Sequence, residues 1–388
     1  MKNSKFCLKS AEFSQKNVLL IAELGTGHQG DTNKAAELID AAAEAGADCI
    51  KFQMVYAREI LHPNTGEVAL PGGKIKLYDR FRELELPLSF FAEMKERVEK
   101  KGLIFLCTPF GLQSARELRE LDPKCIKIAS PELNYSALLQ EIASYNLPVI
   151  LSTGVSRLGD IEEALGILRS EKGEVRREEL SLLTSHFSLL PNICLLHCVT
   201  AYPAPEKDYN LRVLASLNAI FGVPVGVSDH SLDPCLVPGL ATALGAAVIE
   251  KHFCLDRSGC GLDDPIALPP ASFAKMVQAV RAAEKAGAED TLNAMYEDYG
   301  KDEVQAILGD GVKRLAASEK ANYGLTNRSI HALQDIAEGQ IIEKSMISPL
   351  RTEKTLRPGL NPSWEAQIPG RRARTFIPAG EGIRFEDI

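Results

Sequence analysis

The chain has 388 residues, 45% hydrophobic and 25% charged, which is the composition of a globular protein with room for one large domain and a small one. Its 44 basic and 52 acidic residues give a net charge of −8, and no basic run with interleaved aromatic residues occurs, so we expect no nucleic-acid partner. Residues 1–17 contain no apolar h-region and no run is long enough to cross a bilayer, so we expect a cytoplasmic protein with no membrane contact.

Eight short apolar runs begin at residue 18, separated by Ala-, Glu- and Leu-rich segments of helical period. The predicted strands are 18–23, 49–53, 103–108, 125–130, 148–153, 193–198, 224–229 and 247–252, and the predicted helices include 33–46, 89–102, 136–146 and 236–246. Strands this apolar, without strict alternation, are buried on both faces and favour a parallel sheet. Eight β-then-α units predict an α/β fold, a (β/α)8 TIM barrel, over residues 1–286.

Two long connections interrupt this pattern. The segment 54–87 follows the second strand, which predicts a mouth-side loop able to close over a substrate. The segment 170–192 precedes a strand, so we expect it on the opposite face, without a catalytic role.

The chain after the barrel changes character through a linker, 287–325, to a small β-rich domain, 326–388. The stretches "IAEGQIIEKSMI" (336–347) and "IPAGEGIRFEDI" (377–388) share Ile, Gly, Ile and Ile at identical offsets. This repeat predicts a duplicated strand-turn unit.

The nine cysteines show no C-x-x-C pairs. Cys49, Cys107 and Cys198 lie inside apolar runs, where a reduced thiol behaves as a small hydrophobic side chain. We therefore expect neither disulfides nor a structural zinc site.

Almost every predicted strand ends in a titratable or hydroxyl side chain. These are Glu23, Lys51 with Gln53, Thr108, Lys127 with Ser130, Ser152, His197 with Thr200, Ser228 with His230, and Glu250 with His252. Helix capping explains a single Ser or Thr, but not a set that includes lysines, glutamates and histidines. An open doubly wound sheet would concentrate its chemistry at one switch point, whereas the carboxyl ends of barrel strands converge on one mouth.

The residue types at this mouth suit a small anion and a metal. The lysines and hydroxyls are partners for phosphate and carboxylate, and the chain has neither a P-loop nor a G-x-G-x-x-G motif for a nucleotide. His230 and His252 end the seventh and eighth strands, so both can bind one cation; with Glu23 or water they suit Mn²⁺, or Mg²⁺ and Co²⁺, better than a closed zinc site. Lys127 also permits a Schiff-base aldolase interpretation, although its hydroxyl-rich surroundings favour anion binding.

Eight motifs in chain order carry a resemblance to a known family. "IAELGTGHQGD", "AGADCIKFQ", "GLIFLCTPF", "IKIASPE", "PVILSTG", "LLHCVTAYPAP", "PVGVSDHS" and "IEKHF" resemble the sialic acid synthase (N-acetylneuraminate synthase) family, and "NRSIHALQDIAEGQIIEKSMI" resembles its antifreeze-like (SAF) domain. The resemblance implies a metal-dependent transferase of carbohydrate and polysaccharide biosynthesis. It would condense phosphoenolpyruvate with an N-acetylated hexosamine, forming a nonulosonic acid and releasing phosphate.

The resemblance also implies residue roles. Phosphoenolpyruvate would be bound by Lys51, Thr108, Lys127, Ser130, Ser152, Thr200 and Ser228. The amino sugar would be contacted by Gln53, Glu132, Tyr202, Asp263 and Arg328. His230 and His252 would bind Mn²⁺ (or Mg²⁺ or Co²⁺), which polarises the open-chain aldehyde of the sugar, and Glu23 would orient or deprotonate the water that adds at C2. Arg328 would reach into the barrel of a partner subunit, which implies a domain-exchanged homodimer.

Three departures from the family pattern leave the acceptor sugar open. Gly27 replaces an Asn, "CGLDD" (260–264) lacks the prolines and the His of the family motif, and Gly73 stands where some members have Asn. The acceptor is then N-acetylmannosamine or a diacetylated trideoxyhexose leading to legionaminic or pseudaminic acid. An octulosonate or heptulosonate phosphate synthase would need extra arginines for a second phosphate, which the mouth motifs lack. A non-catalytic carbohydrate-binding protein is disfavoured by the retained lysines, histidines and Glu23.

Overall fold

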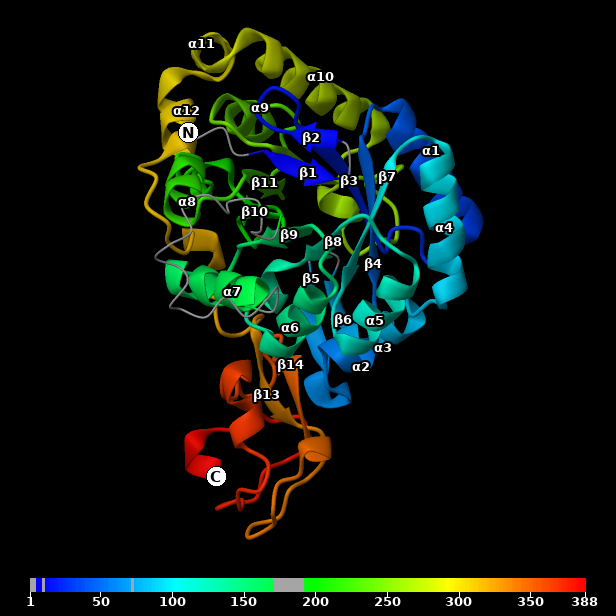
Figure 1. Cartoon of the computed structure of the whole chain (residues 1–388), viewed down its shortest axis with the longest axis vertical. Helices are drawn as coiled ribbons and strands as arrows, with labels where there is room; N and C mark the ends of the chain where they lie inside the picture. Colours follow the sequence, from blue (N-terminus) through cyan, green and yellow to red (C-terminus); the bar gives the residue numbers. More distant parts are fainter. Residues whose placement is uncertain (1–4, 9–10, 71–72, 171–191) are drawn as a thin grey trace, which may run out of the picture.

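The predicted barrel is confirmed by the computed structural model, which describes residues 5–8, 11–70, 73–170 and 192–388 (Figure 1). Its eight strands are β3 (Leu19–Gly25), β4 (Cys49–Met54), β7 (Ile104–Pro109), β8 (Ile126–Ile128), β9 (Val149–Ser152), β10 (Ile193–Cys198), β11 (Val225–Asp229) and β12 (Val248–His252). They pair in the order β7-β4-β3-β12-β11-β10-β9-β8, and all pairs are parallel. The end strands β7 and β8 lie side by side, although no hydrogen-bonded ladder joins them in the described structure, so the barrel is nearly closed.

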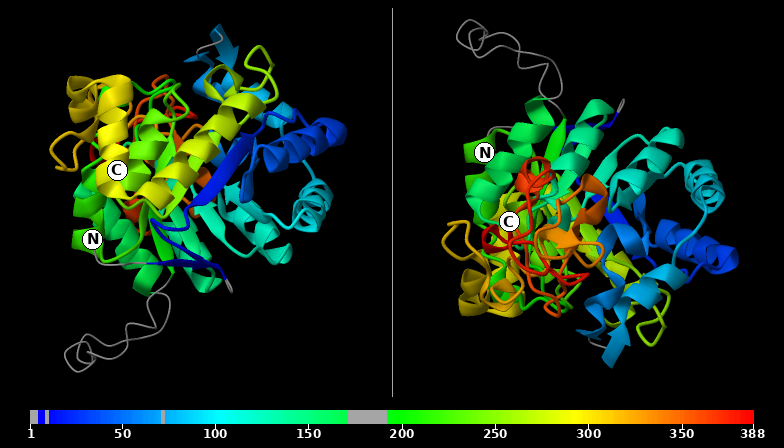
Figure 2. Two further views of the ribbon diagram at one scale, coloured as in Figure 1. Left: turned by 90° about the horizontal axis from the view of Figure 1, so that it is seen from above. Right: turned by 90° about the horizontal axis from the view of Figure 1, so that it is seen from below.

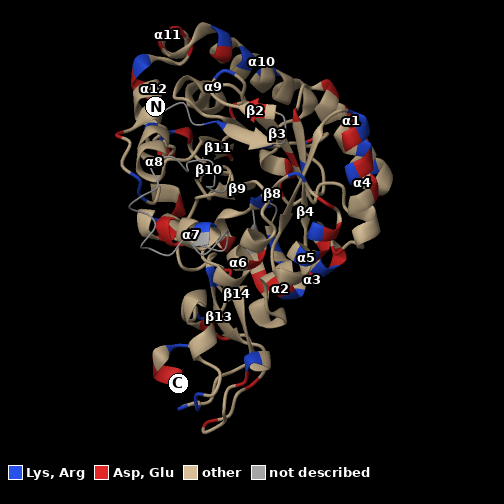
Figure 3. Cartoon of the chain, in the orientation of Figure 1, with Lys and Arg blue, Asp and Glu red and all other residues tan. Residues whose placement is uncertain are grey.

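Helices cover the outside of the barrel. They are α1 (Thr32–Glu44), α4 (Leu88–Lys100), α5 (Leu112–Glu120), α6 (Ser136–Ser144), α7 (Leu158–Ser170), α8 (Val213–Phe221), α9 (Leu236–Ala243) and α10 (Pro270–Ala286). The first begins after Asp31, whose carboxylate accepts hydrogen bonds from the amides of Asn33 and Lys34. Its apolar face, including Leu38 and Ile39, is buried against the sheet, while charged side chains cover the outer faces of α1 and α4 (Figure 3).

An N-terminal hairpin that the sequence patterns did not reveal closes the amino end of the barrel. It consists of β1 (Phe6–Leu8) and β2 (Ala11–Phe13), paired antiparallel. Its side chains Phe6, Leu8 and Phe13 pack on an interior layer that contains Leu19, Ile21, Cys49, Leu106, Cys125, Ile150, Cys194, Leu196 and Val248. All nine cysteines carry free thiols. Three of them fill this layer, where a compact apolar side chain is needed.

The first long connection lies at the mouth of the barrel, as predicted. It forms α2 (Ala57–Ile60), the hairpin of β5 (Glu67–Leu70) and β6 (Gly73–Lys76), and α3 (Leu77–Glu83). Ile60, Leu77 and Phe81 from this connection line the mouth cavity. The second segment, 170–192, falls almost wholly outside the described residues.

After the barrel, α11 (Ala288–Tyr299) and α12 (Lys301–Leu308) pack on its outside, burying Met295, Val304 and Ile307 in the main core. Residues 309–325 then run to the C-terminal domain, which contains β13 (Arg328–Ala332) and β14 (Ile347–Arg351), paired antiparallel. Figure 1 shows this domain below the barrel, and the view from below in Figure 2 shows it nearer to the green half of the barrel than to the blue half.

The sequence repeat builds the core of this C-terminal domain. Ile336 and Ile377, equivalent positions of the two copies, exchange both backbone hydrogen bonds at 2.9 Å. The six repeated isoleucines share one apolar core: Ile336, Ile342, Ile347, Ile377, Ile383 and Ile388. The repeated glycines, Gly339 and Gly380, have φ values of 81° and 93°, a left-handed conformation that favours glycine.

Candidate active site

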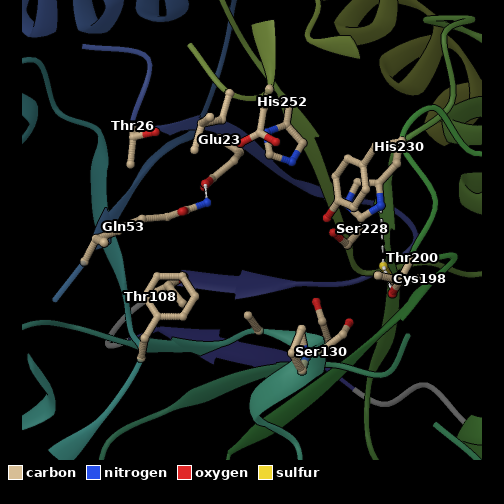
Figure 4. A pocket seen from close by; sticks show the side chains of 18 of the residues that line it. Glu23, Thr26, Gln53, Thr108, Ser130, Cys198, Thr200, Ser228, His230 and His252 are labelled. Carbon is tan, nitrogen blue, oxygen red and sulfur yellow. Dashed lines mark hydrogen bonds and ion pairs between the residues drawn. The ribbon is translucent and has the colours of Figure 1, made fainter. Parts of the chain in front are cut away.

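One cavity at the carboxyl ends of the strands collects most of the predicted site residues (Figure 4). The predicted residues that line it are Glu23, Lys51, Gln53, Thr108, Lys127, Ser130, Ser152, Thr200, Tyr202, Ser228, His230, His252 and Asp263. Strand register explains part of this convergence, because Glu23 is paired with both Lys51 and His252 on the neighbouring strands. Glu132 and Arg328 are not among the lining residues.

Lys51 lies between two buried carboxylates. Its Nζ is 3.1 Å from Glu23 Oε2 and 2.9 Å from Glu250 Oε2. Glu250 also accepts a hydrogen bond of 2.9 Å from Ser228 Oγ. Although burial alone would lower the pKa of Lys51, the two carboxylates raise it above its usual range, so the lysine stays charged.

Lys127 occupies the other side of Glu250. Its Nζ donates to Ser152 Oγ at 2.6 Å and to the carbonyl of Ile128 at 3.1 Å, and lies 3.9 Å from Glu250 Oε1. Burial lowers the pKa of Lys127 to about 8. Burial also opposes ionisation of Glu250, but the charges of Lys127 and Lys51 lower its pKa to about 2. A cation with a hydroxyl partner, able to approach an anion without intervening water, therefore lies at this end of the cavity.

Glu23 has the properties of an acid-base group that works near neutral pH. Burial is the largest cause that raises the pKa of Glu23 to about 7. The charge of Lys51 lowers this pKa, and the charge of Glu250 raises it. Gln53 Nε2 donates to Glu23 Oε1 at 2.7 Å and fixes the orientation of the carboxyl group (Figure 4). A carboxyl group whose pKa is close to the working pH both accepts and returns a proton efficiently.

The two histidines face the same space, with ring centroids 5.5 Å apart (Figure 4). His230 Nδ1 lies 2.9 Å from the carbonyl oxygen of Val199, which fixes that nitrogen as the donor and leaves Nε2 with a lone pair. Tyr202 stacks on His230 at 4.3 Å and holds the ring in place. Burial and the proximity of His230 keep the pKa of His252 well below its usual range, so this ring stays neutral.

The imidazole pair fits an open metal site. No cluster of three His, Cys, Asp or Glu side chains that could hold a metal occurs in the described part of the chain, so water or substrate oxygens would supply the remaining ligands. Asp263 Oδ2 is 3.8 Å from His252 Nδ1, and burial raises the pKa of Asp263 to about 6. Two imidazoles with oxygen ligands suit Mn²⁺, Mg²⁺ or Co²⁺ better than a closed zinc site.

Gly154 lets the backbone after β9 approach two hydroxyls. Its amide donates to Ser130 Oγ at 2.9 Å. A Cβ at this position would lie 2.2 Å from Thr200 Oγ1 and 3.2 Å from Cys198 Sγ, so a larger residue would displace them.

Cys198 is a correction to the sequence analysis, which treated it as a core thiol. It lines the cavity, with Sγ 3.8 Å from His230 Nδ1. Arg351 and Glu353, from the C-terminal domain, also line the cavity and were missed. No spacing signal connects them to the barrel, because only the docking of the two domains brings them there.

Glu132 and Arg328, which the resemblance assigned to the sugar, are placed differently. Both side chains are fully buried, and Arg328 Nη2 lies 2.9 Å from Glu132 Oε1. Arg328 also donates to the carbonyl of Phe110 at 2.6 Å, while Arg351 Nη2 lies 2.6 Å from the same oxygen of Glu132. Arg328 therefore contacts the barrel of its own chain and holds the C-terminal domain on it. The arginine that reaches the cavity is Arg351.

The structure is a nearly closed parallel barrel with lysines, carboxylates and paired histidines at its mouth, followed by a docked repeat domain. The chain belongs to the NeuB family: the NeuB family model matches residues 38–291, and the SAF domain model matches residues 327–388. The resemblance found in the sequence is thereby confirmed. None of the described helices is both long enough and apolar enough to span a membrane.

Similar proteins cover nearly the whole chain. It is 34% identical over 340 residues to the N,N'-diacetyllegionaminic acid synthase of Campylobacter jejuni, covering 87% of this chain and 91% of that protein. It is 32% identical over 382 residues to a pseudaminic acid synthase of Campylobacter jejuni, covering 96% and 97%. The crystal structure of the spore coat polysaccharide biosynthesis protein SpsE from Bacillus subtilis superimposes with a TM-score of 0.79 at 32% identity, covering 99% of both chains.

Proposed function

We propose that this protein condenses phosphoenolpyruvate with an N-acetylated hexosamine, forming a nonulosonic acid and releasing phosphate. The observation that carries the proposal is the arrangement of Lys127, Lys51 and Glu23 at one end of the cavity. It combines two buried cations for the donor anion with a carboxyl group whose pKa is about 7. The names of the relatives, synthases of legionaminic and pseudaminic acid, support the same product class.

The donor would bind where cations and hydroxyls gather. Lys127 donates a hydrogen bond to Ser152. The hydroxyls of Ser130 and Thr200 both lie next to Gly154. These groups match the phosphate and carboxylate of phosphoenolpyruvate, because both anions accept charge-assisted hydrogen bonds.

Glu23 would accept a proton from the attacking water. In the proposed reaction, C3 of phosphoenolpyruvate bonds to the aldehyde carbon of the open-chain sugar, whose oxygen becomes an alkoxide. Water adds at C2 and passes a proton to Glu23, which returns it to the alkoxide. Collapse of the adduct breaks the C2–O bond to phosphate; the C2 hydroxyl gives its proton to the leaving phosphate and becomes the ketone of the product.

His230 and His252 would hold the divalent cation, for which we propose Mn²⁺, Mg²⁺ or Co²⁺. When bound, the cation supplies a Lewis acid for the carbonyl oxygen of the sugar. Tyr202 and the carbonyl of Val199 keep His230 oriented for this task.

The sugar end of the cavity supports an acceptor without a second phosphate. Of the arginines in the described residues, only Arg351 lines the cavity, and it is already 2.6 Å from Glu132 and 3.8 Å from Glu353. Asp263 and Glu353 add carboxyl groups at this end. Such surroundings accept hydroxyl and amide donors and repel a phosphate. The octulosonate or heptulosonate phosphate alternative is therefore disfavoured.

An activity panel tests the proposal. Purified protein with Mn²⁺ and phosphoenolpyruvate is incubated with N-acetylmannosamine, with 2,4-diacetamido-trideoxyhexoses, and with arabinose 5-phosphate or erythrose 4-phosphate. Phosphate release that depends on an acetamido sugar supports the proposal and names the acceptor. Release only with a phosphorylated aldose supports the first alternative. No release with any sugar supports the binding-protein alternative.

We also propose a homodimer in which the C-terminal domains are exchanged. The contacts around Glu132 would then be made between protomers instead of within one chain. Sedimentation equilibrium at micromolar concentration tests this, since a monomeric mass would contradict it.

A further inference from the structure

A second cavity lies behind the active site, between the chain that follows β10 and the segment that follows α12. In Figure 1 this segment, drawn in gold, runs past α8 towards the C-terminal domain. The cavity encloses about 410 Å³, which is within the range of sites that hold small organic ligands. None of its lining residues lines the active-site cavity.

The charge of this cavity is positive. Its charged lining residues are Lys207, Lys313, Arg314 and Lys320 against Asp208 and Asp310. Asp310 forms an ion pair with Arg314, and Asp208 Oδ2 accepts a hydrogen bond of 3.0 Å from the amide of Ser318. Within the described ranges of the chain, no carboxylate forms an ion pair with the three lysines. They are therefore available to an anion.

Two of the lining residues have buried side chains. Lys313 is 8% exposed, and its Nζ donates one hydrogen bond of 2.8 Å, to the carbonyl of Thr153. His197 is 4% exposed; its Nε2 lies 2.6 Å from the carbonyl of Tyr209 and therefore carries the ring proton. Its Nδ1 is then an acceptor, and it has no partner in the described structure. A buried cation with a single hydrogen-bond partner is costly unless an anion also binds it.

We propose that this cavity binds a small phosphate-bearing molecule, with the phosphate held by Lys207, Lys313 and Lys320. The exposed ammonium groups of Lys207 and Lys320 and the buried one of Lys313 are charged hydrogen-bond donors for one phosphate.

Hydrogen bonds connect the residues around this cavity to the loops that follow β9 and β10 at the active site. Lys313 binds the carbonyl of Thr153, the residue after Ser152. Glu319 Oε1 accepts from the amide of Val155 at 2.6 Å and lies 3.4 Å from the amide of Thr200. Ligand binding to Lys313 therefore orders the backbone that carries Ser152 and Thr200, which makes this a regulatory site.

Isothermal titration calorimetry tests the site, with glucose 6-phosphate and inorganic phosphate as separate probes. Phosphoenolpyruvate is left out, because it carries a phosphate and would compete for the proposed site; binding at the donor end is common to the wild type, the variant and the control. The variant is Lys207→Glu/Lys320→Glu, which changes only exposed rim residues, and the control is Lys285→Glu, an exposed lysine on α10. We expect equal affinity in the wild type and the control, and a loss of at least about tenfold in the double variant, because charged hydrogen bonds contribute 1.5–3 kcal/mol each.

Each outcome of the titration either supports or overturns the proposed site. Binding of glucose 6-phosphate supports a phosphate ester as the occupant, whereas binding of inorganic phosphate alone supports free phosphate. No binding of either probe, or an unchanged affinity in the double variant, would overturn the proposal. The variant comparison does not depend on the proposed function, since it holds whether or not phosphoenolpyruvate binds. Amide hydrogen exchange over residues 152–156 and 199–201 should slow with bound probe; unchanged exchange despite binding would refute the coupling.

Discussion

Lys127 donates a hydrogen bond of 2.6 Å from Nζ to Ser152 Oγ, and both side chains are buried at the ends of neighbouring strands. This pair presents a cation and a hydroxyl to one anion. Lys127→Met should raise the KM for phosphoenolpyruvate by about 10- to 150-fold, the equivalent of a charged hydrogen bond of 1.5–3 kcal/mol. Steady-state kinetics measures this. Lys124→Met, on the preceding loop, is the matched control and should leave the KM unchanged.

Activity should follow a narrow bell-shaped pH profile. Below about pH 7 Glu23 is protonated and accepts no proton, so kcat rises as pH increases through the raised pKa of Glu23. Above about pH 8 Lys127 loses its charge, so donor binding weakens as pH passes the lowered pKa of Lys127. In Lys127→Arg the descending limb should vanish, because arginine stays protonated. A descending limb that persists in this variant would assign it to another group.

Metal removal should abolish turnover. A chelator should remove the metal and stop turnover, and added Mn²⁺ should restore it. Both His230→Ala and His252→Ala should be inactive and should bind Mn²⁺ more weakly, as measured by electron paramagnetic resonance of free Mn²⁺. Cys235→Ala, whose thiol lines neither cavity, is the control. Full activity in either histidine variant would refute the metal site.

Substitutions of the two arginines beside Glu132 should affect different properties of the protein. Arg351 lines the cavity, so Arg351→Ala should raise the KM of the sugar while the KM of phosphoenolpyruvate changes little. Arg328 is fully buried, so Arg328→Ala should lower the free energy of unfolding by about 3–5 kcal/mol, which denaturant titration measures. Arg384→Ala, a half-exposed residue paired with Glu386, should shift it by less than about 0.5 kcal/mol. A sugar KM that responds to Arg328→Ala, with unchanged stability, would restore the sugar role implied by the sequence.

Gly154→Ala should weaken donor binding through crowding. The added Cβ would meet Thr200 Oγ1 at 2.2 Å. Thr200→Ala removes that oxygen, so the double variant should lose less affinity for phosphoenolpyruvate than the two single effects predict. Strict additivity in this double-mutant cycle, measured by calorimetry, would contradict the contact.

The barrel and most of its mouth chemistry were predictable because both are local properties of the sequence. A buried strand is apolar over its own few residues, and its last side chains are read directly, as for Lys51 and His252. The isoleucine repeat was likewise visible and became the core of the C-terminal domain.

Features that depend on long-range packing were not predictable. The hairpin around Phe6 and Phe13 has strands of three residues, too short for a periodic signal. Glu250 was visible at a strand end, but its role follows from Lys51 and Lys127 on other strands. Arg351 enters the cavity only through domain docking, and Cys198 resembles its apolar neighbours until the strand ends.

Thr108 and Lys127 lie on the two strands, β7 and β8, that no hydrogen-bonded ladder joins in the described structure. An anion that binds both residues would connect β7 to β8. Donor occupancy should then stiffen the wall itself, and the melting temperature of the barrel should climb with phosphoenolpyruvate concentration even when no sugar is supplied.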